Sequence, residues 1–296
     1  HTMTETPLDL QGSRPLRIPW KAAVMARLRL INRFSSTTVL GEAPVAVNIT
    51  SYGHRLSTVW LAIESIAQGR VKPQRMILWI DDDTFDVKNY PQLLRLQRRG
   101  LEILTCENFG PFKKFYPYIR MTEAQGLALV TADDDLLYPA GWLERMSIAH
   151  QRYPHDLIAV RCHQWTLAKG GTEAAPYSRW GTAQAPSLSH ANFVTGGSGA
   201  VFPLALQERI LRDGTDFTKT CPRADDIWIN IEAIRAGIKA RFVSPTGLTY
   251  ISIPGLQQKS SLHQSNVAEN GNDAQIRATL TTEDIRVLAA EAPVID

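Results

Sequence analysis

The chain has 296 residues, of which 44% are hydrophobic and 21% are charged, and its 32 basic and 29 acidic residues give a formal net charge of +3. This length supports one large α/β domain or two small ones, and the composition is typical of a soluble globular protein. The near balance of charges gives no argument for a nucleic-acid partner, and no apolar run reaches the roughly 18 residues that a membrane-spanning helix needs.

Residues 1–43 are predicted to form an N-terminal extension. His1-Thr2-Met3 is typical of a cleavage scar and is left out of the fold prediction. The segment from Trp20 to Phe34 is basic and amphipathic. It predicts either a helix packed on the domain, which we favour, or a patch that meets an anionic membrane surface.

The three cysteines are widely spaced and form no CxxC pattern. Cys106, Cys162 and Cys221 are therefore expected to be reduced thiols, most of them buried, in a reducing compartment. We accordingly expect a cytoplasmic protein.

Strands and helices alternate from Pro44 onwards. Apolar runs predict strands, and apolar residues at helical spacing predict helices. The expected strands are 45–49, 75–80, 101–104, 127–131 and 157–162, and the expected helices are 56–67, 91–99 and 139–153. This order predicts a mostly parallel sheet with helices on both faces.

The second half is less periodic. Residues 165–192 are expected to form a long loop, and a strand at 200–202 and helices that begin at Pro203 and near Asp225 follow it. A further strand is expected over 238–243.

Acidic triplets follow two of the expected strands. Asp81-Asp82-Asp83 follows the second strand, and Asp133-Asp134-Asp135 follows the fourth. In an extended segment Asp133 and Asp135 point to one side and Asp134 to the other. Ligands bind beyond the carboxyl ends of parallel strands, and paired carboxylates there suit a hard divalent cation.

Six segments in order carry a resemblance to a known family: Thr50-Ser51-Tyr52, the acids after the second strand, residues 109–114 (FGPFKK), residues 132–143 (ADDD followed by YPxxWL), residues 195–199 (TGGSG) and residues 224–228 (ADDIW). Over roughly residues 44–275 the chain resembles the GT-A-fold glycosyltransferases that use nucleotide sugars, of the family 2-like type found in bacterial polysaccharide synthesis. The resemblance implies a Rossmann-like α/β fold with an acceptor-side subregion.

The resemblance also implies an organisation and an activity. Residues 44–162 would bind the nucleotide sugar, residues 163–255 would bind the acceptor and carry catalysis, and residues 256–296 would form a lid segment and a helix. The enzyme would move a hexose, such as mannose or glucose, from a GDP- or UDP-sugar to a saccharide or glycolipid acceptor. The expected cofactor is manganese or magnesium, and the chain would act alone or as a homo-oligomer.

Roles for individual residues follow from the same resemblance. Asp135 would be the principal metal ligand, and His263 is the candidate for a second one; the alternative for His263 is simple exposure. Asp226 or Asp225 would be the catalytic base, and one of the two would cap a helix. Asp83 is preferred to Asp81 for the base or ribose. One of the lysines 113 and 114 would reach the donor, and the other would be solvated. The residues expected to bind the donor are Thr50, Ser51, Tyr52, Asp81, Asp83, Lys113, Asp133, Asp134 and Gly197, and those expected to meet the acceptor are Trp180 and Trp228.

Alternatives stay open at this point. For Trp228, helical spacing favours a place in the core. Acids near the donor occur in both inverting and retaining enzymes. A sugar nucleotidyltransferase would carry a glycine-rich loop after the first strand, and only Gly53 is present there. A non-catalytic carbohydrate- or nucleotide-binding protein is the third hypothesis, and the intact acids argue against it.

Overall fold

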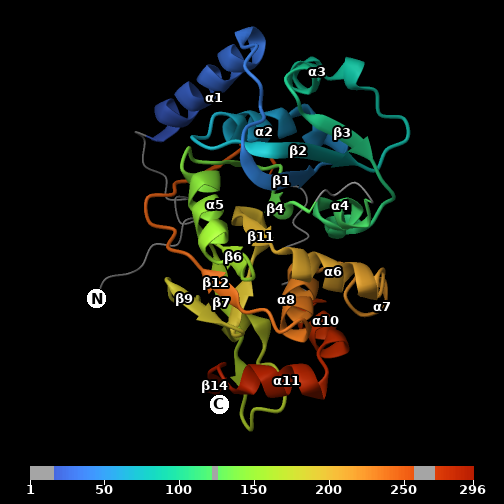
Figure 1. Ribbon diagram of the computed structural model, residues 1–296, viewed down its shortest axis with the longest axis vertical. Helices are drawn as coiled ribbons and strands as arrows, with labels where there is room; N and C mark the ends of the chain where they lie inside the picture. Colours follow the sequence, from blue (N-terminus) through green and yellow to red (C-terminus); the bar gives the residue numbers. More distant parts are fainter. Residues whose placement is uncertain (1–16, 122–125, 257–270) are drawn as a thin grey trace.

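The computed structural model describes residues 17–121, 126–256 and 271–296, and it is built around one large sheet (Figure 1). The eight strands lie in the order β3-β2-β1-β4-β11-β6-β12-β9, where β11 runs antiparallel to β4 and β6, and β9 runs antiparallel to β12. Their bounds are β1 Ala43–Thr50, β2 Pro73–Ile80, β3 Glu102–Thr105, β4 Ala128–Ala132, β6 Leu157–Ala159, β9 Ser187–Ser189, β11 Ala200–Phe202 and β12 Ala240–Phe242. The predicted architecture, a mostly parallel Rossmann-like sheet flanked by helices, is confirmed.

Helices cover both faces of the sheet (Figure 1). On β1, Val45, Val47 and Ile49 pack into one apolar core, and Ala46 between them packs into the other. This alternation follows from the two-residue period of a strand, and it explains why both kinds of position are apolar. The helices are α1 Arg17–Phe34, α2 Val59–Ala67, α3 Pro91–Arg98, α4 Tyr116–Arg120, α5 Trp142–Arg152, α6 Leu204–Asp213, α7 Phe217–Thr220, α8 Asp225–Arg235, α10 Gly271–Thr279 and α11 Thr282–Ala289.

Short elements connect these layers. Single 3-10 turns are η1 Gly53–Ser57, η2 Val87–Asn89, η3 Gly110–Lys114, η4 Tyr177–Arg179 and η5 Gly196–Ser198. Three two-stranded sheets pair β10 with β7, β13 with β5 and β14 with β8. Their strands are β5 Leu136–Leu137, β7 Cys162–Gln164, β8 Leu167–Ala168, β10 Asn192–Val194, β13 Ile251–Ser252 and β14 Val294–Ile295.

The expected strand 157–162 is wrong in its extent. β6 ends at Ala159, and the chain then leaves the large sheet to form β7, which pairs with β10. The expected loop 165–192 is also partly ordered, because β9 within it completes the edge of the large sheet beside β12.

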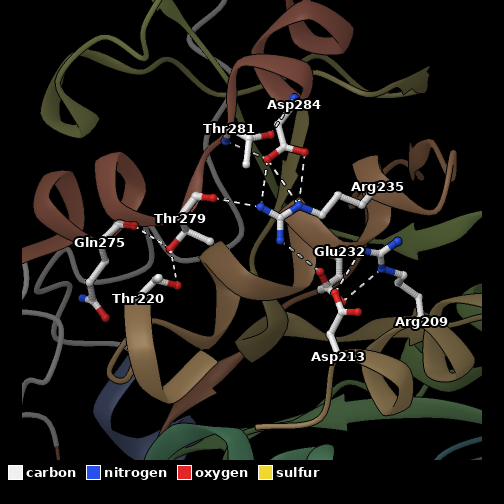
Figure 2. A network of polar contacts seen from close by, with 9 residues as sticks. All are labelled: Arg209, Asp213, Thr220, Glu232, Arg235, Gln275, Thr279, Thr281 and Asp284. Atoms are coloured by element: carbon white, nitrogen blue, oxygen red, sulfur yellow. Dashed lines mark hydrogen bonds and ion pairs between the residues drawn. The ribbon is translucent and has the colours of Figure 1, made fainter. Parts of the chain in front are cut away.

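A polar network fastens the C-terminal helices to α8 (Figure 2). Arg235 of α8 pairs with Asp284 at 2.9 Å and donates a hydrogen bond to the carbonyl oxygen of Thr279 at 2.8 Å. Asp284 also closes a capping box with Thr281 at the start of α11. Buried Glu232, one turn before Arg235, lies 3.5 Å from both Arg235 and Arg209. The network therefore fixes the C-terminal end of a helix whose first residues are Asp225 and Asp226.

None of the described helices is both long enough and apolar enough to cross a membrane. Cys106, Cys162 and Cys221 are free thiols, and the last two are buried.

Candidate active site

The polar residues singled out in the sequence gather at one edge of the sheet. β1, β2 and β4 are neighbours and run parallel, so their carboxyl ends lie together. η3, η5 and the first turn of α8 contribute further side chains to the same edge. The ion pairs and hydrogen bonds described below join residues that lie up to 111 positions apart in sequence, the distance from Lys114 to Asp225.

Asp134 is a buried anchor between β4 and β1. Its carboxylate accepts a hydrogen bond from the hydroxyl of Ser51 at 2.7 Å and pairs with Arg55 of η1 at 2.5 Å. Burial raises the pKa of Asp134, and Arg55 and Ser51 oppose that rise. Asp134 and Ser51 thus hold the strand ends in register rather than standing free for a ligand.

The acids after β2 have different surroundings. Asp81 pairs with Lys113 at 2.7 Å, and the ammonium of Lys113 lies 5.4 Å from the ring centre of Tyr52. Tyr52 is 41% exposed, so its ring is open to a ligand. Asp83 is exposed and lies outside this cluster. Of the two acids predicted to bind the base or ribose, Asp81 is the one held beside Lys113 and Tyr52, and the preference for Asp83 stays a prediction.

Lys114 joins the two halves of the site. Its ammonium lies 2.8 Å from Asp133, after β4, and 3.3 Å from Asp225, at the start of α8. Burial alone would lower the pKa of Lys114, but the carboxylates of Asp133, Asp225 and Asp226 hold it well above its usual value. Since Lys113 is buried as well, the expectation that one of the two lysines is solvated is wrong.

Asp226 is a half-buried carboxyl with a raised pKa. It accepts a hydrogen bond from the backbone N–H of Gly196 at 2.9 Å. Burial, followed by the neighbouring Asp225, raises the pKa of Asp226 to about 7, although Lys114 opposes the rise. A carboxyl of this kind, at the first turn of a helix, exchanges a proton near neutral pH.

Gly197 is required by close packing against Asp133. A Cβ atom at this position would lie 2.3 Å from Oδ2 of Asp133. The hydroxyl of Tyr138 donates to the carbonyl oxygen of Gly197 at 2.7 Å and accepts from the backbone N–H of Asp133 at 2.7 Å. Tyr138 therefore ties the glycine turn of η5 to the end of β4.

Asp135 is the acid best suited to a cation. Burial and the carboxylates of Asp133 and Asp134 raise its pKa to about 6, and Arg55, 3.8 Å away, compensates only in part. A divalent cation would relieve this excess of negative charge. In the parts of the chain that the structure describes, no group of three His, Cys, Asp or Glu side chains could hold a metal ion. A cation here would need oxygen ligands from the donor and water, which is common for magnesium.

Other predicted residues lie in other surroundings. His263 and most of the expected lid segment fall outside the described residues. Trp228 is only 2% exposed, so its prediction as an acceptor platform is wrong and its place is the core. Trp180 is half-buried and packs against Trp165, with ring centres 4.7 Å apart. Thr50, at the end of β1, donates to the carbonyl oxygen of Trp79 at 3.1 Å.

Sequence reasoning assigned no role to Arg55 or Tyr138, and it left Lys114 open between reaching the donor and being solvated. Arg55 neutralises Asp134, Lys114 joins three acids, and Tyr138 fixes the glycine turn. The motifs FGPFKK and YPxxWL contained Lys114 and Tyr138, but their partners are set by long-range contacts that no local pattern encodes.

Comparisons with known proteins add little to this geometry. No model of a protein family matches the chain, and no curated protein sequence is similar to it. The crystal structure of residues 1–349 of S. aureus TarS is similar to the chain, with a TM-score of 0.49 and 13% sequence identity over 83% of this chain and 69% of that one. The case for a function therefore depends on the site itself.

Proposed function

We propose that the protein is a glycosyltransferase that moves a sugar from a nucleoside diphosphate sugar to a hydroxyl group of an acceptor. The observation that carries this proposal is the convergence of Asp133 and Asp225 on Lys114, with Asp226 beside them. It unites a strand end of the kind that binds nucleotides with a carboxyl that is able to accept a proton near neutral pH.

The nucleotide would bind at the ends of β1 and β2. The exposed ring of Tyr52 offers a surface on which a base can stack, and Lys113 beside it supplies positive charge. Asp81 orients Lys113 and is the acid available to a ribose hydroxyl. A GDP- or UDP-sugar carrying a hexose, such as mannose or glucose, is the donor that the motif resemblance favours.

Transfer would begin with deprotonation of the acceptor hydroxyl. Asp226 is the proposed base, since a base whose pKa lies near the working pH is both ionised and able to take a proton. The N–H of Gly196 fixes one oxygen of this carboxylate. Attack by the hydroxyl oxygen on the anomeric carbon would expel the nucleoside diphosphate and invert the configuration at that carbon.

A divalent cation, manganese or magnesium, held by Asp135 and the donor would supply positive charge to the leaving diphosphate. Among the described residues, Arg55, Lys113 and Lys114 are cations paired with the acids that follow β2 and β4, where the diphosphate would lie. Asp133, held by Lys114, would meet the donor beside Gly197, where the lack of a side chain leaves room. The acceptor, a saccharide or a glycolipid, would approach from the side of α8.

Nucleotide binding tests this proposal. The melting temperature of the wild type and of Asp135→Ala would be recorded with UDP, GDP, ADP, CMP and TDP, each with and without manganese. A ligand at about 100 times its dissociation constant should stabilise the protein by roughly 2.7 kcal/mol. We expect a manganese-dependent shift with one nucleotide and its loss in the variant. If no nucleotide raised the melting temperature, the donor site would be wrong.

A further inference from the structure

Helix α1 has one face buried and the opposite face open. Leu28 and Asn32 are buried, and α1 packs on α2 and α3 at the periphery of the molecule (Figure 1). Packing on the domain, the favoured expectation for this segment, accounts for only the buried side of the helix. The other expectation, contact with an anionic membrane surface, concerns the open side. The open side needs its own explanation.

The open side carries large apolar residues. Trp20, Leu30 and Phe34 are 48%, 60% and 78% exposed, and no large hydrophobic side chain among the described residues is more exposed than Phe34. Steps of ten and four residues place all three on one side of an α-helix, because 3.6 residues make a turn. An exposed row of this kind usually marks a contact surface.

The same helix is strongly basic. It contains five basic residues and no acidic one, and α3 beside it contains two basic residues and no acidic one. Since the whole chain carries only +3, the rest of the chain has a formal charge of −4. Arg27, Arg29 and Arg33 are exposed, and in the part of the chain that the structure describes no acidic side chain pairs with any of the three. Three exposed cations thus lie on the same helix as the apolar row.

We propose that the open face of α1 binds the surface of an anionic lipid membrane. Aromatic and aliphatic side chains enter the boundary between headgroups and acyl chains, and the arginine heads stay at the level of the lipid phosphates. The row from Trp20 to Phe34 covers 14 helical steps, or about 21 Å of helix, which suits a helix that lies in the plane of the membrane. This inference does not depend on the proposed enzymatic function.

Charge argues against two other occupants. A second copy of the chain that met this face through its own α1 would bring like charges together, and charged residues are depleted at the centre of protein interfaces. A nucleic acid would satisfy the arginines but would leave Leu30 and Phe34 in water, because most of its contacts are to phosphates.

Sedimentation with lipid vesicles tests the proposal. The full chain is mixed with vesicles of phosphatidylcholine alone or with about 30% phosphatidylglycerol, at low and high salt. The wild type should sediment with the anionic vesicles at low salt, and much less with the neutral ones. Absence of binding to anionic vesicles, or equal binding to both kinds, would overturn the proposal.

Matched variants assign the binding to α1. The triple change Arg27→Gln, Arg29→Gln and Arg33→Gln should weaken binding on the order of 100-fold, at roughly fivefold for each arginine. A control with Arg70→Gln, Arg120→Gln and Arg286→Gln lowers the net charge by the same amount and should change binding far less. If both triple variants lost the same amount of vesicle binding, net charge alone would explain the binding, and the proposal would be overturned.

Apolar variants complete the test. Leu30→Ser with Phe34→Ser should weaken binding by about tenfold or more. The control Ile148→Ser with Leu211→Ser removes side chains that are 61% and 50% exposed on α5 and α6, and should leave binding unchanged. If Leu30→Ser with Phe34→Ser instead abolished a concentration-dependent dimer and left vesicle binding intact, the face would be an interface between copies and the proposal would be wrong.

Discussion

Lys114 lies between carboxylates that come from distant parts of the chain. Asp133 follows β4 and Asp225 begins α8, and both contact the same ammonium. A buried ion pair is costly to desolvate, and removal of one partner leaves an uncompensated charge. The lysine therefore controls how readily the nearby Asp226 ionises.

Replacement of Lys114 by methionine should raise the pKa of Asp226 further, because Lys114 is the main group that opposes its rise. We expect the midpoint of the increase of kcat/KM with pH to move from about 7 to a value about one unit higher. The matched change Lys113→Met, which removes the partner of Asp81, should weaken donor binding and leave that midpoint in place. An unchanged midpoint in Lys114→Met would contradict this role.

Gly197→Ala should disturb Asp133 alone. The new methyl group would lie 2.3 Å from Oδ2 of Asp133, so the carboxylate must move away from Lys114. We expect nucleotide affinity to fall about tenfold with a change of only a few degrees in melting temperature, because the displaced group is a side chain on the edge of the site. Gly181→Ala is the control, because a Cβ atom there has nothing within 4 Å. Equal nucleotide affinities for Gly197→Ala and Gly181→Ala would contradict the proposed contact between Asp133 and the donor.

At the scale of elements, α8 connects the candidate site with the C-terminal helices. Its first turn holds Asp225 and Asp226, and its last turns hold Glu232 and Arg235, which join α6 and α11 through the network of Figure 2. Burial and Asp213 raise the pKa of Glu232 to about 7, although Arg209 and Arg235 lie close to it. This network is therefore sensitive to pH.

The sign of that sensitivity follows from the raised pKa of Glu232. The folded state holds the proton more tightly than the unfolded state, so the stabilisation is full below pH 4.5 and is lost as the pH rises through about 7. In Glu232→Gln, the free energy of unfolding should fall less between pH 5 and 8 than in the wild type, by up to roughly 3 kcal/mol. Denaturant titrations at each pH measure the free energy of unfolding. Glu283→Gln, at an exposed position, is the control. Parallel profiles for Glu232→Gln and the wild type would contradict the role of Glu232.

At the scale of the whole molecule, β1, β2 and β4 could be predicted because these strands are mostly buried and consist mainly of apolar residues. Apolar runs gave a wrong prediction at 157–162. This run reads as one strand, but the chain leaves the large sheet after Ala159 and then begins β7. That departure depends on which partner strand is available, β11 and β12 or β10, and sequence periodicity contains no such information.

The candidate site also contains residues that could be predicted from the sequence and residues that could not. The acids that follow strands, Asp133 and Asp134 among them, could be predicted because the topology brings the ends of parallel strands together. Asp226 begins a helix, and only the motif resemblance pointed to it. The choice between Asp81 and Asp83, the burial of both lysines and the burial of Trp228 depend on contacts across the fold. Spacing predicts which face of an element a residue is on, and it does not predict what lies opposite.

The most direct test of the central claim is the release of nucleoside diphosphate from a panel of nucleotide sugars with manganese, for the wild type and Asp226→Asn. The account predicts release above background with one donor. It also predicts a loss on the order of a hundredfold or more in rate for the variant, with nucleotide affinity near that of the wild type. Equal rates for the two proteins, or no release from any donor in the presence of candidate saccharide and glycolipid acceptors, would contradict it.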